Sequence, residues 1–207
     1  MFKDRIDAGT QLAEKLLKYK NEKVVVVAVP RGGLSIGAIV AKALEASLDV
    51  SLTKKIGHPY HKEYAIGAVS LEDTVLPNAQ GVSQEYITEE TKRIREKLRQ
   101  RHDQYYKKRS PQNLKDKTVI IVDDGVATGN TLLASVALIS KQNPAKIIVA
   151  IPVASRSALD KIKSTGKVDE IVCLEVPNNF QAVGQFYEEF EQVTDEEAIH
   201  ILDTFSN

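Results

Sequence analysis

Two adjacent aspartates, Asp123 and Asp124, stand between a run of apolar residues and a loop of small and hydroxyl-bearing residues. The run Thr118–Val122 predicts a strand buried on both faces. The acid pair then lies at the carboxyl end of that strand, which is where ligands bind in open α/β sheets. Carboxylates at that position can accept hydrogen bonds from sugar hydroxyls or bind a metal ion.

The loop after the acid pair has the composition of a phosphate-binding turn. It leads into a helix expected from Thr131 to about Lys141, and free N–H groups at a helix N-terminus favour anions. Thr128 adds a hydroxyl donor, and Gly129 lets the backbone approach a ligand closely. A sugar phosphate would satisfy the acids and the loop together. The candidate binding residues here are Asp123, Asp124, Gly125, Ala127, Thr128, Gly129, Asn130 and Thr131.

A second glycine turn follows another β-branched apolar run, at residues 24–29. It consists of Pro30, Arg31, Gly32 and Gly33. Two glycines permit a backbone whose N–H groups meet a diphosphate, and a guanidinium presents a planar fork to phosphate oxygens. An ordinary strand-to-helix turn explains the same residues equally well.

Two lysines, Lys54 and Lys55, close the strand expected at residues 50–53. A cation there could reach a diphosphate, and Lys55 is the preferred contact, with Lys54 second. The alternative is a solvent-exposed pair.

Several other phosphate and hydrolase motifs are missing. Gly32 and Gly37 have the spacing of a Walker A loop, but the lysine that should follow is absent. The dinucleotide glycine pattern and the Gly-x-Ser-x-Gly turn are also absent. A metal-dependent phosphohydrolase could use Asp123 and Asp124, but the local sequence lacks the further carboxylates that it needs.

Strand and helix patterns alternate along the chain, which predicts an α/β fold with a Rossmann-like parallel sheet and helices on both faces. Residues 54–82 are irregular and suggest a small insert with short strands at 65–71 and 74–76. Strands are expected at 24–30, 50–53, 118–122, 146–153 and 169–176. Helices are expected at 7–19, 34–44, 88–106, 131–141 and 157–163, and after a capping box at Thr194.

Length and composition indicate one soluble domain, residues 1–207, with an elaboration. The 43% of apolar residues include no run long enough to span a bilayer. The N-terminus lacks the apolar core of a secretory signal, and Cys173 is the only cysteine. A reducing cytoplasm is therefore the expected setting, without membrane contact.

Charge is distributed unevenly along a chain of zero net charge. All 28 basic residues lie at or before Lys167, so residues 168–207 are acidic. This acidic tail could fold against the basic body, or the body could bind an anionic ligand. The expected basic helix at 88–109 has nine Lys or Arg between Lys92 and Arg109. Those residues indicate a solvated face or, alternatively, contact with a partner or nucleic acid.

The acid-pair segment, VDDGVATGNT, resembles the 5-phosphoribosyl 1-pyrophosphate (PRPP) motif of the type I phosphoribosyltransferases. In that family the two acids hold the ribose 2- and 3-hydroxyls and the loop holds the 5-phosphate. By position, Asp123 and Asp124 would take the hydroxyls and residues 127–131 the phosphate. Gly125 departs from the pattern, because a larger apolar residue is more usual there.

Other segments extend the resemblance over most of the chain. PRGG resembles the family's pyrophosphate loop, and KKIGHP, EYAIGAVS and GQFYEEFEQV are similar to a less-characterised branch. The resemblance implies the type I fold with a small hood or insert region and a flexible lid around residues 54–70. Dimers are common in this superfamily, so a homodimer is an expectation.

The implied activity is transfer of the 5-phosphoribosyl group from PRPP to a nucleobase or similar nitrogenous acceptor, as in nucleotide metabolism. The residues expected to act in catalysis are Asp123, Asp124, Arg31 and Lys55. Mg²⁺ is the implied cofactor, bound mainly through PRPP and secondarily by Asp123 and Asp124. The alternative is a PRPP-binding regulator with nucleic-acid contact and little catalysis, which the basic helix keeps open.

Overall fold

Five parallel strands form the central sheet of this computed structural model, which describes residues 1–107 and 109–205. The strand order is β2-β1-β6-β7-β8, and neighbouring strands pair in parallel along their length. The strands are β1 (Val24–Ala28), β2 (Ser47–Val50), β6 (Thr118–Val122), β7 (Lys146–Val153) and β8 (Glu170–Glu175).

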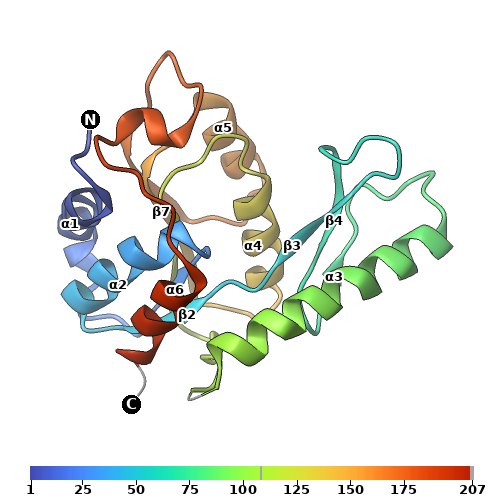
Figure 1. Cartoon of the computed structure of the whole chain (residues 1–207), viewed down its shortest axis with the longest axis horizontal. Coiled ribbons are helices and arrows are strands. Elements are labelled where there is room, and N and C mark those ends of the chain that lie inside the picture. Colours follow the sequence, from blue (N-terminus) through green and yellow to red (C-terminus); the bar gives the residue numbers. More distant parts are fainter. Residues whose placement is uncertain (108, 206–207) are drawn as a thin grey trace.

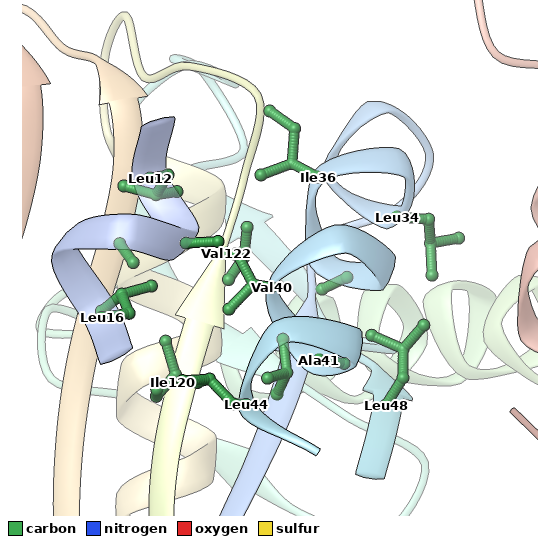
Figure 2. Close-up of a cluster of buried hydrophobic side chains, with 14 of the residues drawn as sticks. Leu12, Leu16, Leu34, Ile36, Val40, Ala41, Leu44, Leu48, Ile120 and Val122 are labelled. Atoms are coloured by element: carbon green, nitrogen blue, oxygen red, sulfur yellow. The ribbon is translucent and has the colours of Figure 1, made fainter. Parts of the chain in front are cut away.

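Helices cover both faces of this sheet (Figure 1). On one face lie α1 (Arg5–Leu16), α2 (Gly32–Leu44) and α6 (Asp195–Asp203), and on the other lie α4 (Asn130–Ser140) and α5 (Arg156–Ser164). Figure 2 shows Leu16 of α1 and Val40 of α2 packed over Ile120 of β6. Both faces of each inner strand are buried, which confirms the predicted α/β class and explains the continuous apolar runs.

An antiparallel unit is inserted between β2 and β6. It contains β3 (Lys54–Gly57), β4 (Ala65–Val69) and β5 (Thr74–Val75), followed by the long helix α3 (Gln84–Tyr105). Ile56 and Ile66 of the small sheet pack against Ile94 and Leu98 of α3 in a cluster of their own. Figure 1 shows this insert to one side of the main body, next to α4.

Some element boundaries differ from those expected. The second strand is Ser47–Val50, because these residues pair with Val25–Ala28 soon after α2 has ended at Leu44. Lys54 and Lys55 do not close that strand; they begin β3, which pairs with β4. The basic helix starts at Gln84 and ends at Tyr105, and Lys108 of the expected range lies outside the described residues.

The acidic tail contacts the basic body at several points. Glu170 pairs with Lys18 at 2.6 Å, Glu175 with the N-terminal amino group at 3.2 Å, and Asp195 with Arg31 at 3.6 Å. These contacts support the interpretation that the tail folds against the body. None of the helices within the described residues is both long enough and apolar enough to cross a membrane.

Candidate functional site

The two glycine-bearing loops expected to bind a phosphorylated sugar lie against each other. Strands β1 and β6 are neighbours in the sheet, so their carboxyl ends are adjacent. A Cβ on Gly33 would lie 2.8 Å from the carbonyl oxygen of Val122 and 3.0 Å from Cα of Asp123. A Cβ on Gly32 would overlap the Asp124 carboxylate. Glycine is therefore required where the Pro30–Arg31 turn, which contains a cis peptide bond, meets the acid pair.

The acid pair is held by backbone and side-chain contacts at the end of β6. Both aspartates are partly buried, and the Asp124 N–H donates to Oδ1 of Asp123 at 2.9 Å. The Tyr187 hydroxyl donates to the Asp124 carbonyl oxygen at 2.6 Å. Burial, and then the adjacent Asp124 carboxylate, raise the pKa of Asp123 well above its usual range.

Arg5, the first residue of α1, is the counterion of Asp124. Its Nε and Nη2 lie 2.9 and 2.8 Å from Oδ2 of Asp124. Its remaining amino group, Nη1, donates to the carbonyl oxygen of Glu191 at 2.6 Å. The two side chains are only 12% and 14% exposed, so this ion pair is shielded from solvent.

The raised pKa of Asp123 predicts a pH-dependent effect on stability. Between the ordinary pKa and the raised value, the folded state holds a proton that the unfolded chain releases, so stability falls as pH rises through that window. Asp123→Asn removes the buried charge but keeps an oxygen to accept from the Asp124 N–H. We expect the variant to be more stable than wild type by about 1 kcal/mol at neutral pH. The difference should shrink at about pH 4. Calorimetric melting at both pH values tests this, and an equal difference at the two would contradict it.

The phosphate loop, residues 127–131, is held by hydrogen bonds to its carbonyl groups, while several of its side chains are exposed. Gly129 is the N-cap of α4 with φ of 80°, and as a glycine it has no side chain to occupy the first N–H groups of the helix. The Ser155 hydroxyl donates to the Ala127 carbonyl oxygen at 2.6 Å, and Lys161 Nζ donates to that of Thr128 at 3.3 Å. Ala127, Thr128 and Thr131 are exposed. The loop carbonyls are thus hydrogen-bonded to the start and the side of α5, while the exposed side chains of the loop leave space for an anion at the N-terminus of α4.

Glu63 contacts both Lys55 of β3 and Asn130 of the phosphate loop. Lys55 Nζ lies 2.8 Å from Oε2 of Glu63, and Asn130 Nδ2 donates to the Glu63 carbonyl oxygen at 3.5 Å. The loop at residues 58–64, between β3 and β4, therefore lies beside Asn130, while Lys54 is exposed. Arg31 pairs with Asp195 and Lys55 pairs with Glu63. Among the described residues these two cations therefore share no acidic partner in an ion pair.

Several residues at the site carried no sequence signal for it. Arg5 and Asp195 belong to segments far from both loops in sequence, and Tyr187 is 63 residues from Asp124. Gly125, the departure from the expected motif, has a structural reason: a Cβ there would overlap Val183 in the tail segment that covers the loop.

The acid pair could contribute to a magnesium site only together with a ligand. Within residues 1–107 and 109–205, no three His, Cys, Asp or Glu side chains are grouped to hold a metal ion. Mg²⁺ is commonly bound by one or two carboxylates plus substrate phosphates and waters. Two adjacent carboxylates beside a phosphate loop fit that mode of binding.

Comparison with known proteins gives consistent matches over most of the chain. The model of the family described as "Phosphoribosyl transferase domain" matches residues 2–190. A Mycobacterium tuberculosis protein named "Putative phosphoribosyl transferase Rv0571c" is 35% identical over 98% of this chain and 46% of its own length. The chain thus spans about half the length of the curated relative it matches.

Two further matches differ in extent. The crystal structure of TT1426 from Thermus thermophilus has a TM-score of 0.93 and 38% identity over 100% of this chain and 99% of its own. A uracil phosphoribosyltransferase from Mycoplasma genitalium is 42% identical over 59 residues, 28% of each chain. The structural match covers the insert as well as the main sheet.

Proposed function

Because the chain belongs to the phosphoribosyl transferase domain family, we propose that it transfers the 5-phosphoribosyl group of PRPP to a nitrogenous acceptor and releases pyrophosphate. The observation that carries this proposal is the contact between Gly32–Gly33 and the acid pair Asp123–Asp124. That contact joins a turn suited to a diphosphate with carboxylates suited to ribose hydroxyls. The phosphate loop at 127–131 follows directly on the same strand end.

Each part of the site has a role in this reaction. Asp123 and Asp124 accept hydrogen bonds from the ribose hydroxyls and favour the positive charge that develops on the ring as pyrophosphate leaves C1. Arg31 and Lys55 offset the negative charge that develops on the leaving diphosphate. Binding of the 5-phosphate at residues 127–131, away from the reacting carbon, aligns the sugar.

Magnesium fits this arrangement as a companion of the substrate. When bound, Mg²⁺ would supply further neutralisation of the diphosphate charge, held by PRPP oxygens and by Asp123 or Asp124. The metal requirement can be measured directly by titrating activity in the presence of a chelator.

The β3–β4 loop, residues 58–64, is proposed as a lid that excludes water from the reacting carbon. When PRPP binds, Lys55 at the base of this loop would exchange its Glu63 partner for the diphosphate. Lys55→Met should therefore raise KM for PRPP about tenfold, because one charge-assisted contact is lost. Lys54→Met is the matched control, since Lys54 is exposed on the same strand, and its effect should be smaller. Steady-state kinetics that rank the two variants in the reverse order would contradict the role of Lys55.

The acceptor is proposed to be a nucleobase. The similarity to a uracil phosphoribosyltransferase over 59 residues makes uracil one member of the panel to test. The protein should be incubated with PRPP, Mg²⁺ and mixed nucleobases, and the products analysed by mass spectrometry. A new nucleotide supports the proposal, whereas intact PRPP with every base contradicts it.

The basic helix leaves nucleic-acid binding as a second candidate function. Arg93 pairs with Glu90 at 2.5 Å, and Arg95 donates to Thr74 Oγ1 at 3.0 Å, so these two cations stabilise the insert. Other basic residues of this region are exposed: Lys92, Lys97, Arg99, Arg101 and Lys107. Filter binding of RNA and DNA across a salt series separates the candidates, because contact with phosphates gives a steep decline in affinity with salt.

Cellular setting and assembly also remain proposals. We place the protein in a reducing cytoplasm, where the single Cys173 needs no disulfide partner. Burial raises the pKa of this thiol to about 11, so it stays protonated at neutral pH. A homodimer is the proposed assembly, which sedimentation velocity would test.

A further inference from the structure

We propose that Arg5 is a positioning residue that holds Asp124 in the orientation needed to bind the ribose of PRPP. This inference rests on the proposed function. It adds a residue from the first helix to the acid pair, which otherwise lies among loops at the ends of β1 and β6.

Two nitrogens of the Arg5 guanidinium contact the same carboxylate oxygen of Asp124. Nε and Nη2 lie 2.9 and 2.8 Å from Oδ2, so the side edge of the guanidinium is directed at that oxygen. Oδ1 is left free of the guanidinium. A carboxylate fixed through one oxygen has lost most of its rotational freedom before the sugar arrives, which favours binding.

Arg5 is itself held on three sides. Its guanidinium carbon lies 4.0 Å from the centre of the Phe190 ring, and Nη1 donates to the Glu191 carbonyl oxygen at 2.6 Å. Asp4 caps α1 by accepting from the Asp7 N–H at 2.8 Å, which fixes the start of the helix that carries Arg5. A lysine could supply the charge but not this three-way fit, because it lacks the planar fork.

The tail segment that supports Arg5 is anchored to the start of the chain. Phe2 N–H donates to the Phe186 carbonyl oxygen at 2.8 Å, and the N–H groups of Glu188 and Glu189 donate to Phe2 and Lys3 at 2.9 Å. These backbone hydrogen bonds hold the tail segment against the start of the chain, and the tail segment in turn holds Arg5 beside Asp124. Such supporting contacts decide how precisely a site is held.

Inorganic pyrophosphate separates this role from a general structural one. Without Mg²⁺, which could bridge it to the acid pair, pyrophosphate would bind the Arg31 turn without using Asp124. Ribose 5-phosphate and PRPP both present the ribose hydroxyls. A positioning role for Arg5 therefore predicts weaker binding of the two sugar ligands and unchanged binding of pyrophosphate. Loss of the fold would weaken all three equally.

The experiment is calorimetric titration of the 207-residue chain with PRPP and ribose 5-phosphate in the presence of Mg²⁺, and with pyrophosphate in its absence. Arg5→Met keeps the apolar length over Phe190 and removes the charge, and Arg5→Lys keeps the charge. Lys15→Met, at an exposed position of the same helix, is the control. Arg5→Met should bind PRPP about 10-fold to 100-fold more weakly than wild type. The affinity of Arg5→Lys for PRPP should lie between those of wild type and Arg5→Met. Lys15→Met should match wild type.

The outcomes distinguish this inference from the proposed function. Wild-type protein that binds none of the three ligands overturns both. Wild-type binding of PRPP with equal binding by Arg5→Met overturns the role of Arg5 alone. Equal weakening of PRPP and pyrophosphate also overturns it, since that would mean general damage. Should Arg5→Met fail to fold, Arg5→Lys decides by the same comparison.

Discussion

Asp124→Asn is expected to lower kcat/KM for PRPP by about 100-fold to 1,000-fold, the range seen when one preorganised electrostatic group is removed from a transition state. The substitution keeps the shape of the side chain and removes the charge that the developing ribose cation requires. It also removes the anion that faces Arg5 at 2.8 Å. Initial-rate kinetics at saturating and limiting PRPP would measure the effect.

The control for this variant is Asp103→Asn, at an exposed position in α3. Because Asp124→Asn leaves the Arg5 charge without its partner, we expect some loss of stability as well. The double variant Arg5→Met with Asp124→Asn should recover part of that stability but none of the activity. Turnover of PRPP by Asp124→Asn at the wild-type rate would refute the assignment of this residue.

Gly32→Ala is expected to weaken PRPP binding and to lower kcat/KM by about 100-fold, the cost in rate of misplacing a reacting group by roughly 1 Å. A Cβ at Gly32 would overlap the carboxylate of Asp124 and lie 2.7 Å from its Cγ, so this side chain must move. Gly32 is the first residue of α2, and alanine is the better helix former, by about 1 kcal/mol in a helix interior. Helix propensity thus predicts a variant at least as stable as wild type, whereas the site geometry predicts weaker binding of PRPP.

The control for Gly32→Ala is Ser35→Ala, in the same helical turn. Calorimetry should show weaker PRPP binding in the glycine variant and wild-type binding in the serine variant. If Gly32→Ala is more stable than wild type and binds PRPP equally well, then the two loops are not in the contact described.

Most of the parallel sheet, including β1 and β6 at whose carboxyl ends the site lies, could be predicted from the sequence because the signals are local. Thr118–Val122 and Lys146–Val153 are β-branched runs buried on both faces, and the structure has strands at those residues. The capping box at Thr194 and Glu197 is also present, since both partners lie within one helical turn. The positions of the acid pair and the glycine turn at neighbouring strand ends follow from the same alternation.

The strands of the insert at 65–69 and 74–75 were expected, but its first strand and the residues that support the site were not predictable in this way. The strand at Lys54–Gly57 contains two charged residues and a glycine, so its pattern gave no strand signal, and only pairing with β4 defines it. Arg5 and Asp124 are 119 residues apart, and Arg31 and Asp195 are further apart still. Contacts of this kind depend on how the tail crosses the start of the chain, which local periodicity does not describe.

The central claim is that the acid pair and the loop at 127–131 bind opposite ends of one activated sugar. Calorimetric titration of the wild-type protein with PRPP and Mg²⁺ tests this claim most directly. We predict a saturable heat of binding with one site per chain, strongly reduced in Asp124→Asn. No heat of binding for PRPP, or an identical isotherm for Asp124→Asn, would contradict the claim.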